Sequence, residues 1–295
     1  MSEASTAREL IQFAEQQFKQ ADLFYGHGTT SAEDEAFYLI MTVAGLEFDC
    51  EETKLDERLP EETINKIKEL IDIRINQRIP VAYLVNQAWF AGHQFYVDER
   101  VLIPRSPIAE LIEYEFTPWV EPEDVEHILD IGTGSACIPI ACAYIFPNAQ
   151  IDAVDIDDDA LEVAKMNVEQ HKMNDRVHLY KSDLFDQLDS KKYDIIISNP
   201  PYVGHEEMQT LPQEYRHEPG HALQADDDGL ALVDRILKQA SNHLNDDGIL
   251  IVEVGNSMEA LIERHPELPF IWLDFENGGE GVFLLHKADL VGNQF

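Results

Sequence analysis

Residues 127–135 read His-Ile-Leu-Asp-Ile-Gly-Thr-Gly-Ser, and this stretch decides the fold. The apolar run over 127–131 predicts a buried strand, and Gly132 and Gly134 predict a tight turn directly after it. A helix is expected over 135–145. Glycines at the end of a first strand let a ligand come close to the backbone. The stretch therefore predicts the first βα unit of an open α/β sheet that binds a ligand at its strand ends.

Three further strand ends carry polar groups in the order that such a site requires. Asp155 ends the apolar run over 151–155, and an acidic residue at about this distance from a glycine turn accepts hydrogen bonds from ribose hydroxyls. Asp183 lies just past another expected strand in 177–185, and a fourth run, 195–198, leads into Asn199. Because ligands bind at the carboxyl ends of the strands in open α/β sheets, the four ends together indicate one site.

The fourth strand continues as Asn199-Pro200-Pro201-Tyr202, which predicts a rigid ledge. The Asn199 side-chain carbonyl and the Pro200 backbone carbonyl can both accept hydrogen bonds, and two acceptors side by side suit a planar NH2 group. Proline has a locked φ and no N–H, so the ledge need not reorganise, and Tyr202 can stack on a flat substrate. The tetrapeptide favours chemistry on a carboxamide or a nucleobase amine, although a Pro-rich loop that caps a strand would also explain it.

These motifs together resemble the S-adenosylmethionine-dependent methyltransferases of the seven-strand Rossmann-like class. The segment Val-Leu-Ile-Pro-Arg over 101–105 narrows the resemblance to the HemK/PrmC-PrmB family of protein glutamine methyltransferases. Release-factor enzymes of that family usually continue Pro-Arg-Pro-Asp-Thr-Glu, whereas this chain reads Pro-Arg-Ser-Pro-Ile-Ala-Glu over 104–110. That variant, with Glu-Tyr-Arg-His-Glu-Pro over 214–219 and Phe-Glu-Asn-Gly-Gly over 275–279, resembles the branch that methylates a glutamine of large-subunit ribosomal protein three.

The resemblance implies S-adenosylmethionine as the cofactor and gives roles to the strand ends. Asp155 is expected to hold the ribose, and Asp183 to accept from the adenine amine beside the N–H of Leu184. The full expected cofactor set is Asp130, Gly132, Thr133, Gly134, Asp155, Ile156, Asp183, Leu184 and Asn199.

The resemblance also implies the substrate site. The expected catalytic residues are Asn199, Pro200, Pro201 and Tyr202, and the substrate is expected on Asn199, Pro200 and Tyr202. Arg105 is interpreted either as a contact to substrate or to the cofactor's carboxylate, or as one half of a structural ion pair. Glu110 is expected to be structural.

The charge bears on the choice of substrate. Lys and Arg total 21 against 57 Asp and Glu, a formal net charge of −36. Such a surface should repel phosphates and attract a basic protein, so a ribosomal protein is the expected partner and no stable nucleic-acid binding is expected. A release-factor glutamine methyltransferase, a nucleic-acid amine methyltransferase and a non-catalytic cofactor-binding assembly factor stay as alternatives. A solvated acidic face suited to a salty or cold habitat would explain much of the charge equally well.

Composition excludes several other classes of protein. No run of 18 apolar residues exists, so no membrane span is expected, and the first residues lack the pattern of a secretory signal. Cys50, Cys137 and Cys142 show no paired metal spacing and the 11 histidines are scattered, so no metal is expected. Three cysteines favour a reducing cytoplasm. The sequence predicts no oligomeric state.

The organisation along the chain predicts three parts. Residues 1–85 read as a helical substrate-recognition domain, with apolar stripes such as Leu10, Ala14 and Phe18. Residues 86–121 are expected to form a hairpin, running to 103, and a linker. Residues 122–295 are expected to form an α/β, Rossmann-like seven-stranded class I methyltransferase domain.

Overall fold

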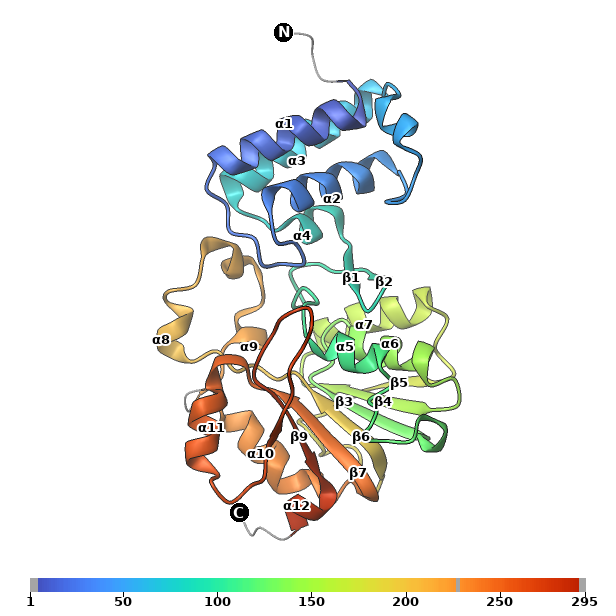
Figure 1. The fold of residues 1–295 in the computed structure, drawn as a ribbon, viewed down its shortest axis with the longest axis vertical. Helices are drawn as coiled ribbons and strands as arrows, with labels where there is room; N and C mark the ends of the chain where they lie inside the picture. The colour runs from blue at the N-terminus through green and yellow to red at the C-terminus, as the bar shows by residue number, and fades with distance from the viewer. Residues whose placement is uncertain (1–4, 227–228, 292–295) are drawn as a thin grey trace. The chain divides into compact units, whose positions relative to one another are not determined.

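The computed structural model describes residues 5–226 and 229–291, which divide into two compact units (Figure 1). One unit comprises the chain up to residue 88 together with 212–217, and the other comprises 89–211 and the chain from 218 onward. Sequence patterns give no sign that 212–217 should join the helical unit.

The helical unit is built on stripes of apolar side chains. A capping box between Thr6 and Glu9 starts the first helix, and Ser31 caps the second by accepting from the N–H of Asp34. Leu10 and Phe18 are fully buried, as the stripe predicts. The helices are α1 Ala7–Gln20, α2 Ala32–Ala44, α3 Glu61–Gln77 and α4 Val81–Val85, with short 3-10 turns η1 Glu52–Asp56 and η3 Gln213–His217.

A buried arginine attaches 212–217 to this unit. Arg74 on α3 is 0% exposed, and its guanidinium donates to Glu35 at 2.9 Å and to Glu214 at 3.1 Å. A third N–H binds the carbonyl of Phe24 at 2.9 Å. A buried guanidinium is tolerated only when its donors are paired. Glu214 supplies one of the paired acceptors, and this contact holds residues 212–217 on the helical unit.

The second unit contains one seven-stranded sheet in the order β5-β4-β3-β6-β7-β9-β8. The first five of these run parallel, and β9 is antiparallel to both β7 and β8. The expected seven-stranded α/β fold is therefore confirmed. The strands are β3 His127–Ile131, β4 Gln150–Asp155, β5 Val177–Lys181, β6 Tyr193–Ser198, β7 Leu244–Glu253, β8 Ile271–Trp272 and β9 Val282–His286.

Helices cover both faces of the sheet (Figure 1). Residues on alternate positions of the strands divide between two cores; for example, Ile128 faces one core and Leu129 the other. One core packs on α5 Ile108–Glu113, α6 Cys137–Ile145 and α7 Asp158–Gln170. The other packs on α10 Ala231–Ala240, α11 Met258–Arg264 and α12 Lys287–Val291, and the remaining short elements are α8 His205–Met208, α9 Gly220–Leu223, η2 Pro122–Asp124 and η4 Gly255–Ser257.

The expected hairpin is shorter than predicted. Its strands are β1 Ala88–Phe90 and β2 His93–Phe95, and no strand is found over 96–103. Asp98 explains the early end, because its carboxylate accepts from the backbone N–H of Arg100 at 3.1 Å and its carbonyl accepts from Val101 at 3.1 Å. These local hydrogen bonds compete with strand pairing.

Candidate active site

The turn between β3 and α6 is held open beside the sheet. Gly132 has φ +76° and Gly134 φ +53°, the left-handed region that favours glycine. The N–H groups of Gly132 and Thr133 both donate to the carbonyl of Val154 on β4, at 2.9 and 3.0 Å. A Cβ built on either glycine would meet nothing closer than 4.0 Å, so the space beside the turn can admit a ligand.

Asp130 lies under this turn as a buried acceptor. It is 1% exposed, and neither carboxylate oxygen has a hydrogen-bond partner within 5–226 and 229–291. The neighbouring Thr133 hydroxyl is likewise unpartnered among those residues. Burial, together with the charge of Asp155, raises the pKa of Asp130 to about 7. Since a buried acceptor without a donor is costly, this carboxylate fits a ligand that brings an ammonium or another strong donor.

Asp155 and Ile156 follow directly at the end of β4. The two oxygens of Asp155 accept from the N–H of Gly134 at 2.9 Å and of Asp157 at 3.0 Å. These bonds fix the carboxylate, and burial raises its pKa. Each carboxylate oxygen has a second lone pair for a ligand hydroxyl. Ile156 is 61% exposed, so its side chain is available for apolar contact with a ligand.

Asp183 and Leu184 form the third strand-end element. Asp183 is half-exposed and accepts from Arg235 on α10 at 2.9 Å, a partner that the sequence did not indicate. The backbone of Leu184 has φ +51°, and the Ser182 hydroxyl donates to its carbonyl at 2.8 Å. The Asp183 oxygen turned from Arg235 can accept from an amine, as expected for adenine.

The ledge follows β6 and lies next to the glycine turn. The Ser198 hydroxyl donates to the carbonyl of Ile131 at 2.8 Å, which joins the ends of β6 and β3. The backbone carbonyl of Asn199 is 4.0 Å from the position of a Cβ on Gly132. The Asn199 side-chain amide makes no hydrogen bond to any described residue. The structure thus brings the backbone of Asn199 beside the expected cofactor turn, with Pro200 buried and Pro201 half-buried after it.

Tyr202 is held by residues at the end of β7, which no sequence motif marks. Its hydroxyl donates to Glu253 at 2.8 Å, and its carbonyl accepts from the Ser257 hydroxyl at 3.1 Å. A Cβ on Gly255 would lie 2.6 Å from the Tyr202 ring, so the ring packs directly on that glycine. Glu253 carries the same signal as the predicted residues, a polar side chain at the end of an apolar strand.

Arg105 forms a bidentate ion pair with Glu218. Its two terminal nitrogens donate to the two oxygens of Glu218, at 2.5 and 2.7 Å, and the Glu218 side chain is fully buried. The N–H of Ile103 donates to the same carboxylate at 3.1 Å. The structure therefore places Arg105 in the ion pair that one of its two interpretations expected. Glu110, expected to be structural, accepts from the backbone N–H groups of Glu276 and Asn277.

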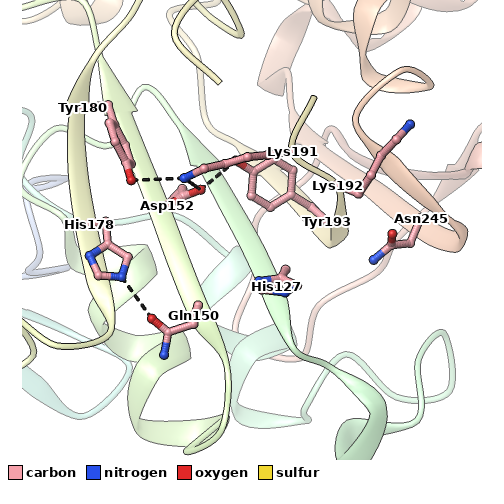
Figure 2. Close-up of a pocket in the computed structure, with 9 residues that line it drawn as sticks. All are labelled: His127, Gln150, Asp152, His178, Tyr180, Lys191, Lys192, Tyr193 and Asn245. Carbon is pink, nitrogen blue, oxygen red and sulfur yellow. Dashed lines mark hydrogen bonds and ion pairs between the residues drawn. The ribbon is translucent and has the colours of Figure 1, made fainter. Parts of the chain in front are cut away.

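A separate pocket lies at the opposite ends of the strands (Figure 2). His127 and Gln150, which line it, begin β3 and β4. Inside it, Asp152 accepts from Lys191 at 2.8 Å and from the Tyr193 hydroxyl at 2.7 Å (Figure 2). Because the candidate site residues follow the carboxyl ends of the strands, this pocket is distinct from the candidate site.

Two negative findings concern the described residues only. Within 5–226 and 229–291, no group of three or more His, Cys, Asp or Glu side chains could hold a metal ion. In the same part of the chain, no helix is long and apolar enough to cross a membrane.

Comparisons with known proteins identify related methyltransferases. Residues 118–263 match the family model described as "Methyltransferase small domain". A curated protein of Francisella tularensis subsp. tularensis (strain SCHU S4 / Schu 4), named ribosomal protein uL3 glutamine methyltransferase, is 46% identical over 287 residues, covering 97% of this chain and 91% of its own length. A protein of the same name from Neisseria meningitidis serogroup B (strain ATCC BAA-335 / MC58) is 45% identical over 293 residues, covering 99% and 96%.

Among solved structures, the hMettl16 catalytic domain in complex with the MAT2A 3′UTR hairpin 6 superposes with a TM-score of 0.52 at 19% identity. The match covers 79% of this chain and 84% of that one, and it shows the shared methyltransferase fold.

Proposed function

This chain belongs to the family of ribosomal protein uL3 glutamine methyltransferases, and we propose that it methylates the side-chain amide nitrogen of a glutamine in uL3. S-adenosylmethionine is the methyl donor. The observation that carries the proposal is the position of Asn199, which follows β6 and has its backbone carbonyl beside the Gly132 turn.

The residues around the turn fit this donor. Its methionine part carries an ammonium group, which the unpartnered Asp130 carboxylate would accept. Asp155 is oriented by two backbone N–H groups to accept from the ribose, and the Asp183–Leu184 segment would receive the adenine. When bound, the cofactor supplies an electrophilic methyl group on a positively charged sulfur. Carboxylates near that charge also favour binding.

The ledge supplies orientation to a poor nucleophile. A primary amide nitrogen reacts slowly because its lone pair is delocalised into the carbonyl. Acceptance of both N–H hydrogens, by the Asn199 side chain and the Pro200 carbonyl, raises electron density on the nitrogen and points it toward the cofactor turn. Such positioning contributes up to ~7–11 kcal/mol to lowering a bimolecular barrier. The substrate nitrogen can lose its proton after transfer, so no strong general base is needed.

The remaining parts of the chain support the choice of substrate. The net charge of −36 disfavours nucleic acid and suits a basic ribosomal protein. We propose that the helical unit recognises that protein, since the groups for methyl transfer all lie in the other unit. We also place the reaction in the cytoplasm, in keeping with cysteines that form no disulfide.

The test is transfer of a labelled methyl group to purified uL3, a class-one release factor and unmethylated DNA, assayed side by side. We expect label on uL3 alone, and its loss when the target glutamine is replaced by asparagine. Label on the release factor would keep the chemistry and refute the substrate. Label only on DNA would refute the argument from charge.

A further inference from the structure

The carboxylate of Glu253 joins two segments that are distant in sequence. Glu253 ends β7 and is 5% exposed. One of its oxygens accepts from the Tyr202 hydroxyl at 2.8 Å, and the other accepts from the Ser106 hydroxyl at 2.5 Å. Ser106 in turn accepts from the N–H of Ile108 at 3.2 Å, at the start of α5. A single buried group therefore fixes both the ledge and the segment that precedes α5.

The Tyr202 ring packs closely on the backbone of a neighbouring glycine. Gly255 has φ +45°, and any Cβ on it would lie 2.6 Å from the ring. A Cβ on Gly229 would lie 2.1 Å from the Tyr202 carbonyl oxygen, so the Tyr202 backbone is closely packed as well. With the ring confined by backbone and its hydroxyl bound to Glu253, Tyr202 cannot turn without breaking a charge-assisted hydrogen bond.

Packing alone does not explain why a carboxylate is buried at the position of Glu253, because its removal from water costs free energy. A carboxylate removed from water must be compensated by donors, and its two direct donors are neutral hydroxyls. The nearby Arg105 guanidinium contributes charge, but its paired nitrogens bind Glu218. An apolar residue would cover the end of β7 at lower cost, whereas a carboxylate holds a tyrosine hydroxyl at a defined place.

We propose that Glu253 is a positioning residue for methyl transfer, which sets Tyr202 against the substrate amide and, through Ser106, holds the segment before α5 at the same site. This inference rests on the proposed function. Glu253 acts through Tyr202, whose hydroxyl it holds. Its loss should therefore lower kcat and leave cofactor binding unchanged.

The experiment compares Tyr202→Phe, Glu253→Gln and the double variant, measuring kcat and KM with uL3 and Kd for S-adenosylmethionine. Each single change should lower kcat by roughly tenfold, the size expected for one oriented hydrogen bond, with the cofactor Kd within about twofold. The double variant should lose little more than either single variant, because both break the same contact. Ser106→Ala should lower kcat less, by roughly threefold, and Ser106→Thr should restore it, since threonine keeps the donor.

The matched control lies at the other end of β6 (Figure 2). Tyr193 donates to the buried Asp152 at 2.7 Å, so Tyr193→Phe makes the same chemical change away from the site. We expect it to lower the thermal midpoint about as much as Tyr202→Phe and to leave kcat unchanged.

Two results would overturn the inference. One is a kcat within twofold of the wild-type value in both Tyr202→Phe and Glu253→Gln. The other is a fall in kcat for Tyr193→Phe as large as the fall for Tyr202→Phe. The wild-type protein is assayed first with every acceptor. Absence of transfer to all of them refutes the proposed function and this inference together. Transfer that the variants leave unchanged refutes this inference alone.

Discussion

Replacement of Asp130 by asparagine should have opposite effects on two properties. It should stabilise the cofactor-free protein at neutral pH and weaken the binding of the methyl donor. The carboxylate is buried without a hydrogen-bond donor among the described residues, and its pKa is raised from 3.8 to about 7 by burial and by the charge of Asp155. The folded state therefore binds this proton more tightly than the unfolded chain does. The associated stabilisation is complete below pH 4 and is lost as the pH rises to about 7.

The magnitude follows from the shift in pKa. The whole effect corresponds to about 4 kcal/mol, of which about 2 kcal/mol is lost between pH 5 and pH 7. An asparagine has no such proton. Between pH 5 and pH 7, the unfolding free energy of Asp130→Asn should therefore rise by about 2 kcal/mol relative to that of wild type, and it should change little above pH 7. Urea denaturation of the cofactor-free protein in half-unit steps from pH 5 to 8.5 measures this change.

The same substitution should weaken cofactor binding. An ionised Asp130 can form a charge-assisted hydrogen bond with the cofactor ammonium, so calorimetry at pH 8 should show Kd raised by roughly 10- to 100-fold in the variant. Asp152→Asn is the control, because that buried carboxylate is paired with Lys191 and Tyr193, and its loss should destabilise the protein. A stability difference that does not change with pH, or an unchanged Kd, would refute the reasoning.

Three further substitutions test the site. Asn199→Ala should lower methyl transfer by ~100-fold or more with cofactor Kd nearly unchanged. A large loss of cofactor binding would contradict the assignment of the Asn199 side chain to the substrate amide. Arg105→Ala leaves the buried Glu218 carboxylate without its cation and should cost about 3–5 kcal/mol in urea denaturation, whereas a change below 1 kcal/mol would contradict a structural pair. Gly255→Ala, which forces a Cβ to 2.6 Å from the Tyr202 ring, should lower kcat by ~10- to 100-fold in a protein that still folds by circular dichroism; unchanged kcat would mean that the ring position does not matter.

The parts of the fold that could be predicted are those with a local signal. An apolar run followed by glycine or a carboxylate marks a strand end, and Asp130, Asp155 and Asn199 all lie where such runs end. The helical stripe of α1 is likewise a short-range pattern, because its buried positions repeat every three to four residues. A sheet of parallel strands then brings separate ends to one edge without further information.

The parts that could not be predicted depend on pairs that are far apart in sequence. Ser106 and Glu253 are 147 residues apart, and Arg74 and Glu214 are 140 residues apart. No periodicity links such residues, and each alone reads as an ordinary polar side chain. Arg105 stayed open between two roles for the same reason, since the partner that pairs with it is 113 residues away. The Asn-Asp-Asp-Gly stretch over 245–248 is typical of a turn, yet it lies within β7, which begins at Leu244 and has an irregular register there.

The negative charge of the protein serves two separable purposes. Asp130 and Asp155 are enclosed, so water and salt screen them weakly and they act on a cation bound within reach. Most of the remaining carboxylates are exposed, where screening limits each charge to about 8 Å at physiological ionic strength. Their sum can bring a basic protein to the surface faster, but it cannot choose which glutamine enters the site. In our proposal the helical unit makes that choice. The ledge then selects for an amide, because Asn199 and Pro200 would accept a planar NH2 group beside the tyrosine that Glu253 holds.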